Sequence, residues 1–320
     1  CECARSRAFS GAYSGAAFNP LPYALTLFLV AVYLVAGLGS IEQAANGAGL
    51  VLCGSILNDF VLPKLLKTNK YIICPYIDMA NHNSNSPNAD VAFEYFADAY
   101  SLAISSNKSI PNDKQLFISY GPRSNDQLLQ YYGFVEANNP NDIYVMPPVR
   151  EWNIEAIEKA CDTTFSAGRL AKLDKAGLLG QPQTTKQSSG DDSNISNDLE
   201  PANVAGGVVI TKSEGIDPAV LQALRALVST DDEWEAAGEA IGNFAALVNQ
   251  SNERRAKLAA KTAMELELSS KSTTLEEDLA LLKTVDTKLA SSTMDEEEKI
   301  ALLFRVEKKK LLKAAITNMG

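Results

Sequence analysis

A single histidine, His82, limits the chemistry that this 320-residue chain can perform with its side chains. A nucleophilic triad, an HExxH zinc site and a two-histidine iron site would each have to be built around His82, and none has supporting spacing. Neither a GxxxxGK(S/T) phosphate loop nor a GxGxxG motif between a strand and a helix occurs. Any chemistry must therefore proceed without an imidazole relay and without a metal held by the protein.

Cysteine usage and charge exclude further classes. The five cysteines are scattered and form no CxxC pair, so a zinc site or a disulfide scaffold is not expected, and a reducing compartment fits better. A formal net charge of −10 disfavours nonspecific binding to nucleic acid. The length favours two domains.

Four short stretches combine residue types that could form a site. They are "RSRAFS" at 5–10, "DMANH" at 78–82, "ISYG" at 118–121 and "YYGF" at 131–134. In this order they resemble the catalytic half of SET-domain protein methyltransferases, of the branch that includes the Rubisco large-subunit lysine methyltransferases. The tail, with "TTLEEDLALL" and "FRVEKKKLLKAAI", is similar to the helical substrate-binding domain of that branch.

This resemblance implies methyl transfer from S-adenosylmethionine to a lysine side chain of a non-histone protein. Such a transfer is an in-line displacement, so alignment of donor and acceptor supplies much of the acceleration, and no nucleophilic side chain is needed. The lysine must arrive neutral. A narrow apolar channel beside a sulfonium lowers the pKa of that lysine by desolvation and like charge, which aromatic walls favour.

The resemblance also implies a role for each matching residue. Tyr120 matches the active-site tyrosine, and Asn81 the asparagine that binds the amino-acid end of the cofactor. His82 matches the residue that meets the adenine, largely through its backbone, and Phe134 an aromatic near the adenine. Arg7 matches the arginine between cofactor and substrate. Without that context these would be a core tyrosine, a capped turn, a core phenylalanine and a surface arginine.

On the substrate side the matching residues are Arg7, Asp78, Phe93 and Tyr132, the last lining the lysine channel. Two departures are visible: Phe93 stands where the related enzymes have a channel tyrosine, and Gly11 where they have a second arginine. The first, glycine-containing cofactor segment of the family, which precedes "SRAF", does not occur. We therefore expect a fragment that binds the methyl donor weakly unless an upstream part completes it.

The expected fold is α+β: the C-terminal part of a SET domain over residues 1–148, with short β-sheets and a pseudoknot, followed by an all-α substrate-binding domain over residues 149–320. Aromatic and β-branched runs between Asn, Ser, Pro and Asp clusters predict strands within residues 71–148. "SNDQLLQYYGF" predicts a short helix that ends in a turn.

A nearly continuous apolar run, "LPYALTLFLVAVYLVAGLG", and the half-apolar stretch after it predict a buried helical insertion at about residues 11–70. A membrane span is the alternative, because about 20 apolar residues suffice to cross a bilayer. The flanking prolines and glycines and the lack of a Lys or Arg cluster disfavour it.

Helical signals dominate the second domain. Asp217 with Pro218 predicts a helix start, and Thr273 with Glu276 and Thr293 with Glu296 have capping-box spacing. A polar segment at about 180–205 predicts a disordered loop. The lysines at 308–310 are interpreted as a solvated face.

Other functions remain open: a SET-derived scaffold without turnover, or a methyltransferase with a histidine acceptor. The expected partner is a lysine-containing protein, with no nucleic acid and no membrane. The resemblance implies a chloroplast location, with the cytoplasm as the alternative.

Overall fold

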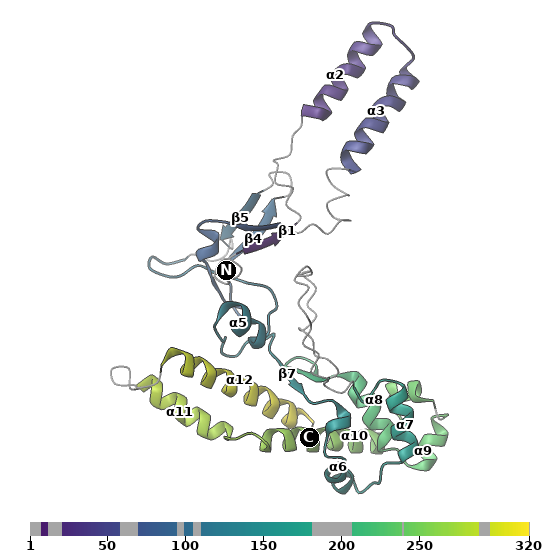
Figure 1. Ribbon diagram of the computed structural model, residues 1–320, viewed down its shortest axis with the longest axis vertical. Helices are drawn as coiled ribbons and strands as arrows, with labels where there is room; N and C mark the ends of the chain where they lie inside the picture. The colour runs from purple at the N-terminus through teal and green to yellow at the C-terminus, as the bar shows by residue number, and fades with distance from the viewer. Residues whose placement is uncertain are drawn as a thin grey trace. The chain divides into compact units, whose positions relative to one another are not determined.

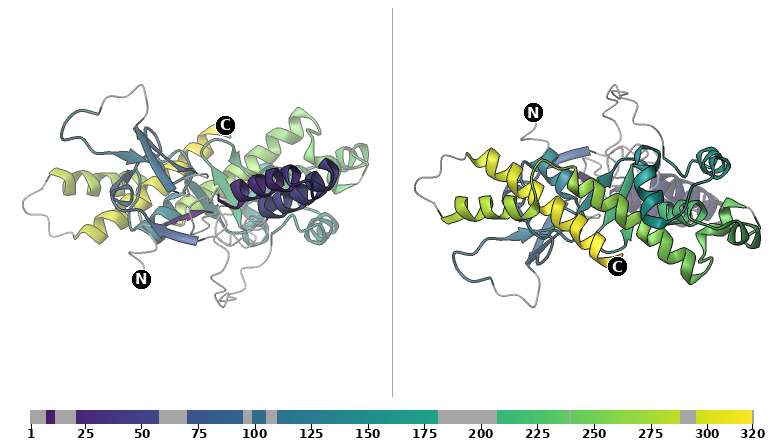
Figure 2. Two further views of the ribbon diagram at one scale, coloured as in Figure 1. Left: turned by 90° about the horizontal axis from the view of Figure 1, so that it is seen from above. Right: turned by 90° about the horizontal axis from the view of Figure 1, so that it is seen from below.

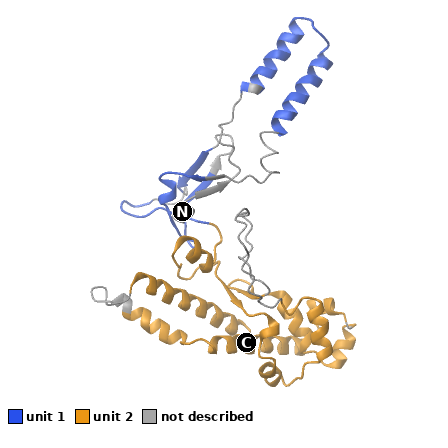
Figure 3. Ribbon diagram, viewed as in Figure 1, with its two compact units in different colours: residues 1–120 blue, residues 121–320 orange. Residues whose placement is uncertain are grey.

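The computed structural model has short paired strands and a helical hairpin before residue 120, and is mostly helical after residue 150 (Figure 1). It describes residues 8–11, 21–57, 70–94, 99–104, 110–180, 207–238, 240–287 and 295–319. The chain divides into two units, Cys1–Tyr120 and Gly121–Gly320 (Figure 3). This boundary follows compactness, whereas the predicted domain boundary at residues 148 and 149 follows the resemblance and stays a prediction.

Among the described residues of the first unit are three two-stranded sheets and a helical hairpin. Strands β1 and β2 pair antiparallel, as do β4 and β5, whereas β3 and β6 pair parallel. The bounds are β1 (Ala8–Gly11), α2 (Leu21–Val35), α3 (Ile41–Ile56), β2 (Lys70–Ile73), the 3-10 turn η2 (Ile77–Met79), β3 (Asn81–His82), β4 (Ala89–Glu94), β5 (Ala99–Ile104) and β6 (Phe117–Ile118). The strands predicted from the sequence are confirmed.

The hairpin of α2 and α3 is helical, as the apolar run predicted, but it is not buried. The two helices pack on each other. Large apolar side chains nevertheless remain exposed, including Leu27, Phe28, Leu29, Leu50 and Val51. The burial expected for this insertion is therefore wrong for the described residues, because α2 is apolar on every side and a single partner helix covers only one stripe of it.

The second unit is mostly helical. Its elements are α5 (Asn125–Tyr132), β7 (Ile143–Met146), η3 (Val149–Glu151), α6 (Ile154–Cys161), α7 (Ala167–Lys175), β8 (Val208–Thr211), β9 (Gly215–Ile216), α8 (Pro218–Leu227), α9 (Asp231–Ala236), η4 (Ile241–Ala245), α10 (Gln250–Ser269), α11 (Leu275–Thr287) and α12 (Glu296–Asn318). Helix α12 packs beside α11 and contacts α10 (Figure 2). The expected class, short sheets followed by a helical region, is confirmed.

A three-stranded antiparallel sheet, β7–β8–β9, adds to the helical region. The sequence analysis did not indicate β8 and β9, which are short strands beside a glycine-rich stretch. Val208 and Ile210 are buried and belong to the main core of this unit. The sheet therefore joins the chain before residue 148 to the chain after it in one core.

Helix starts in the second unit follow the local sequence. Asp217 caps α8 by accepting a hydrogen bond from the N–H of Ala219 over 2.8 Å, with Pro218 at the first helical position, as predicted. The capping box predicted at Thr273 lies one residue later, at Thr274 and Glu277, whose side chains and backbone N–H groups bond reciprocally. The box predicted at Thr293 and Glu296 is wrong: Asp295 caps α12 by accepting from the N–H of Glu298 over 2.8 Å, and Glu296 is the first helical residue. The loop predicted at about 180–205 lies outside the described residues except for Gly180.

Candidate active site

The short parallel pair of β3 and β6 sets the geometry of the candidate site. Asn81 pairs with Phe117 and His82 with Ile118, so residues 36 positions apart in sequence stand opposite each other. Ile118 is buried together with Ala80 and Ala89, and this small cluster carries Tyr120 packed against it. The apolar cluster thus fixes the ends of two strands from which the polar residues project.

Tyr120 is held at both its backbone and its phenol. Its hydroxyl donates to the carbonyl oxygen of Ala80 over 2.8 Å, and its N–H donates to Nδ1 of His82 over 3.0 Å. The two rings stack with centroids 4.9 Å apart and planes inclined by 29°. The phenol oxygen therefore has a fixed position immediately after β6, and its own proton is directed at a backbone carbonyl.

His82 uses both ring nitrogens within the protein. Nδ1 accepts from Tyr120, so the ring proton is on Nε2, which lies 2.8 Å from Oγ of Ser84. The side chain is buried. His82 is thus held as one neutral tautomer, and the expectation that it performs no proton transfer stays a prediction.

Asn81 presents an exposed side-chain amide beside this pair. One N–H of the amide donates to Oε1 of Gln115 over 2.8 Å. A carboxamide has a second N–H and an acceptor oxygen. The amide thus fits the predicted role of binding the amino-acid end of S-adenosylmethionine, which carries both an ammonium and a carboxylate.

Asn88 is a residue that the sequence analysis missed. Its Oδ1 accepts from the N–H of Phe117 over 2.8 Å, its Nδ2 donates to the carbonyl of Gln115 over 3.1 Å, and its N–H donates to the carbonyl of Phe117 over 3.0 Å. Asn88 therefore holds β6 and the residues before it through three hydrogen bonds that are separate from the β3–β6 pairing. An asparagine after a proline indicated only a turn, so no sequence signal would have found this role.

The acceptor side predicted from the resemblance is described only in part. Asp78 lies in η2. Burial raises the pKa of the Cys74 thiol, and electrostatic repulsion by the nearby Asp78 raises it further. Burial and then the proximity of Cys74 raise the pKa of Tyr100. Tyr100 of β5 lies directly opposite Phe93 of β4 in the antiparallel pair. A tyrosine that was not predicted for the site therefore neighbours a predicted channel position. The Phe93 side chain and Arg7 lie outside the described residues.

Tyr132 and Phe134 belong to the second unit, at the end of α5. Ser124 and Gln127 form a capping box at the helix start, and Gly133 ends it in the left-handed conformation. The rings of Tyr132 and Phe134 are 6.3 Å apart, and both side chains are half-buried. Burial raises the pKa of Tyr132, Arg123 partly offsets this, and Tyr131 adds to it. This phenol therefore stays protonated well above neutral pH.

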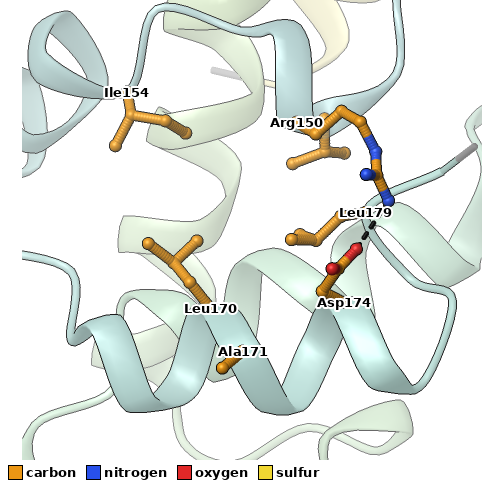
Figure 4. Close-up of a pocket in the computed structure, with 7 residues that line it drawn as sticks. Arg150, Ile154, Leu170, Ala171, Asp174 and Leu179 are labelled. Atoms are coloured by element: carbon orange, nitrogen blue, oxygen red, sulfur yellow. Dashed lines mark hydrogen bonds and ion pairs between the residues drawn. The ribbon is translucent and has the colours of Figure 1, made fainter. Parts of the chain in front are cut away.

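A separate pocket of about 360 Å³ lies in the second unit, lined by Val149, Arg150, Ile154, Leu170, Ala171, Asp174 and Leu179 (Figure 4). Arg150 donates to Oδ1 of Asp174 over 2.6 Å at its edge and to the carbonyl of Gly180 over 2.7 Å. These bonds tie η3 to α7 and to the turn after it. None of the residues that the sequence analysis assigned to the site lines this pocket.

Two structural findings concern the described residues alone. No group of three or more His, Cys, Asp or Glu among them is arranged to hold a metal ion. Of the described helices, none combines the length and apolarity that crossing a membrane requires.

Comparison with known proteins agrees with the resemblance. Residues 169–312 match the family model described as Rubisco LSMT substrate-binding. The chain is 38% identical over 74 residues to the ribosomal lysine N-methyltransferase set10 of Schizosaccharomyces pombe, covering 22% of this chain and 13% of that protein. It is 38% identical over 80 residues to an actin-histidine N-methyltransferase of Drosophila melanogaster, covering 25% and 13%.

A third relative is the human SET domain-containing protein 4, 30% identical over 95 residues, which are 29% of this chain and 21% of that protein. The chain thus spans about a fifth or less of the length of these relatives. A solved structure described as Rubisco LSMT bound to AdoMet aligns over 99% of this chain and 65% of its own, with 17% identity and a TM-score of 0.44.

The chain is therefore similar to SET-domain methyltransferases over short stretches. Residues 169–312 of its second unit match a Rubisco LSMT substrate-binding domain, and the resemblance to the Rubisco methyltransferase-like branch is confirmed.

Proposed function

We propose that this chain is part of an S-adenosylmethionine-dependent protein methyltransferase that modifies a lysine side chain of a non-histone protein. The observation that carries the proposal is the fixed phenol of Tyr120, bonded to the Ala80 carbonyl and stacked on His82 directly beside the exposed amide of Asn81. Relatives described as a lysine and a histidine N-methyltransferase support methyl transfer as the reaction class.

The cofactor, when bound, supplies a methyl group on a positively charged sulfur. Asn81 would bind its amino-acid end through the side-chain amide, and the backbone around His82 would meet the adenine. The Tyr120 hydroxyl donates its proton to the Ala80 carbonyl, and a phenol oxygen can accept as well as donate, so this oxygen would accept from the incoming amine or from the polarised methyl group. This oxygen would align donor and acceptor without forming a covalent bond to either.

Lysine is the proposed acceptor, and histidine is the second candidate. Two fission-yeast relatives are described as ribosomal lysine N-methyltransferases, and one fruit-fly relative as an actin-histidine N-methyltransferase. Acid hydrolysis of the labelled product followed by amino-acid analysis separates methyllysine from methylhistidine. Methylhistidine alone would overturn the lysine assignment and leave methyl transfer intact.

The test of the reaction is transfer of a tritiated methyl group from S-adenosylmethionine to proteins of a broad lysate by the full-length protein. Tyr120→Phe is expected to lower labelling by about 10-fold or more, since one positioned group contributes on this scale. Tyr33→Phe, at a half-buried tyrosine of α2 in the same unit, is the matched control and is expected to label at the wild-type rate.

Donor binding distinguishes the enzyme from a SET-derived scaffold. Calorimetry with S-adenosylmethionine is expected to show saturable binding by the full-length protein, and a scaffold need not bind it. Binding without labelling of any protein would contradict the proposed activity. A plastid location, proposed from the resemblance, is tested by imaging a fluorescent fusion of the full-length protein in a plastid-bearing cell.

A further inference from the structure

The side-chain amide of Asn125 ties the start of α5 to the chain that follows its end. Asn125 is fully buried. Its Oδ1 accepts from the N–H of Glu136 over 3.0 Å, and its Nδ2 donates to the carbonyl of Glu136 over 3.1 Å. The amide thus pairs with the backbone of one residue as a neighbouring strand would. Residues 132–136 form a loop that is anchored at both ends.

This loop carries the two aromatic residues of the proposed site. Tyr132 is the last residue of α5, Gly133 ends the helix, and Phe134 follows. Val135 is buried and precedes the anchored Glu136. The positions of Tyr132 and Phe134 therefore depend on the hydrogen bonds of Asn125.

Asp142 in turn fixes Asn125. One carboxylate oxygen, Oδ1, accepts from the N–H of Asn125 over 2.9 Å and from the N–H of Ile143 over 3.0 Å. The other, Oδ2, accepts from Nδ2 of Asn125 over 3.1 Å. Asp142 is only 4% exposed, so its carboxylate lies almost without water. A charge in that position requires a compensating cation.

Lys308 of α12 supplies that cation. Its ammonium donates to Oδ1 of Asp142 over 2.8 Å, to the carbonyl of Ile143 over 2.6 Å, and to the carboxylate of Asp126. The three protons of the ammonium thus meet three acceptors. Lys308 is 8% exposed and lies 166 residues from Asp142 in sequence.

We propose that Lys308 is a positioning residue for Tyr132 and Phe134, acting through Asp142 and Asn125. Lys308 lies within residues 169–312, the substrate-binding match, so that domain sets the geometry of an aromatic segment outside it. The importance of this geometry for turnover rests on the proposed function. The geometry itself does not.

Stability alone is a weak reason for such a pair. Removing two charges from water costs several kcal/mol, and a well-packed apolar pair in the same place is often equally stable or more so. A network that fixes one amide in one orientation instead restricts the chain that this amide holds. Here the restricted chain is the loop of Tyr132 and Phe134.

Lys309 provides a matched control in the same helix. It is 5% exposed, and its ammonium donates to Oδ2 of Asp278 over 2.6 Å and to the carbonyl and hydroxyl of Thr273 over 2.5 and 2.8 Å. These partners lie at and before the start of α11, and none of them bonds to α5 or β7. Lys309→Met therefore removes an equally buried ion pair without touching the Asn125 network.

The first experiment measures geometry without turnover. Full-length protein is labelled with 3-fluorotyrosine, and the Tyr132 resonance is assigned through Tyr132→Phe in fluorine NMR. Lys308→Met is expected to shift or broaden that resonance, and Lys309→Met to leave it in place. An unchanged Tyr132 resonance in a folded Lys308→Met protein would overturn the proposal.

Folding is controlled by a second variant. Lys308→Met leaves the Asp142 charge buried without its cation, which can unfold the protein. The double variant Lys308→Met with Asp142→Asn removes that charge. It is expected to recover a cooperative melt while the Tyr132 resonance stays displaced. Recovery of both the melt and the wild-type resonance would show that Lys308 serves only to neutralise Asp142, and would also overturn the proposal.

The second experiment connects the geometry to turnover, with free L-lysine as the acceptor probe and tritiated S-adenosylmethionine as donor. Lys308→Met is expected to lower kcat by about 10-fold to 100-fold, because a small misplacement has that effect. Lys309→Met is expected to retain kcat and to keep donor affinity within about 2-fold, because its partners are not shared with the Asn125 network. A displaced Tyr132 resonance with unchanged kcat would contradict the role in turnover, whereas wild-type protein that methylates neither lysine nor lysate would contradict the proposed function alone.

Discussion

The backbone N–H of Tyr120 points at the ring of His82, and the two rings stack at 4.9 Å. One interaction thus links the only histidine of the chain to the proposed catalytic tyrosine. The histidine orients the tyrosine and carries no mobile proton, because its second nitrogen faces Ser84. Loss of the imidazole should therefore change the position of the Tyr120 phenol and should not remove an acid or a base.

His82→Ala is expected to lower the free energy of unfolding of the full-length protein by ~1–3 kcal/mol, since the Tyr120 N–H loses its acceptor in a part-buried place. Urea denaturation followed by circular dichroism measures this loss. Ser84→Ala removes only the partner of Nε2 and is expected to cost less than about 1.5 kcal/mol. Equal losses for the two variants would contradict the orienting role of Nδ1.

Asn81→Ala is expected to weaken binding of S-adenosylmethionine by the full-length protein about 10-fold, as for a lost hydrogen bond to a charged group. Gln115→Ala removes the protein partner of the same amide and leaves Asn81 in place. Calorimetric titration of S-adenosylmethionine into both variants shows whether the affinity depends on Asn81 itself or on its bond to Gln115. If Asn81→Ala binds as wild type does, the cofactor assignment of this residue is wrong.

Glu233 makes the second unit sensitive to acid. Burial alone would raise the pKa of Glu233, but hydrogen bonds lower it to about 2; the donors are Asn249, the Thr230 backbone, Arg255 and Asn252. A lowered carboxyl pKa stabilises the folded state above the unfolded value of 4.5, and this stability is lost as pH falls toward 2.

Between pH 5 and pH 2 we therefore expect wild-type protein to lose ~1–2 kcal/mol of unfolding free energy through this group, after allowance for solvent screening. Glu233→Gln should be less stable at neutral pH and flatter across this range. Glu235→Gln, an exposed residue of the same helix, is the control and should follow the wild-type curve. Parallel curves for all three proteins would contradict the role of Glu233.

Gly133→Ala is expected to destabilise the protein by ~1 kcal/mol, because the residue has φ of 75° and only glycine adopts this without strain. A Cβ there would meet no atom within 4 Å, so the effect comes from the backbone and not from a clash. Gly168→Ala inside α7 is the control and should have the opposite sign, by ~0.5–1 kcal/mol. Thermal melts of the two variants check both signs.

Local sequence motifs of a few residues were enough to predict Asn81, His82 and Tyr120 as site residues, and the structure brings these three together. The same patterns gave the strands β2, β4 and β5 and the helix α5. Local sequence patterns did not predict the parallel pairing of β3 with β6 or the hydrogen bonds by which Asn88 holds β6. Such partners are separated by about 30 residues and obey no local periodicity.

The lysines at 308–310 show that a local sequence pattern can also predict the wrong environment. A run of three lysines indicates a solvated face, and that interpretation is wrong for Lys308 and Lys309, which are buried in separate ion pairs. Successive helix positions are rotated by about 100°, so adjacent lysines point to different neighbours. The carboxylates that receive them, Asp142 and Asp278, lie on other elements and leave no trace in the local pattern.

The bond between Asp142 and Lys308 has a consequence for dividing the chain. A fragment that ends at residue 148 would keep the carboxylate and lose the ammonium, and the complementary fragment would have the reverse problem. Each piece would then contain an ionised group shaped for burial with nothing to neutralise it. The chain up to residue 148 and the helical chain after it therefore depend on each other for this ion pair, and joining either one to the corresponding half of a distant relative should succeed only where both charges are present.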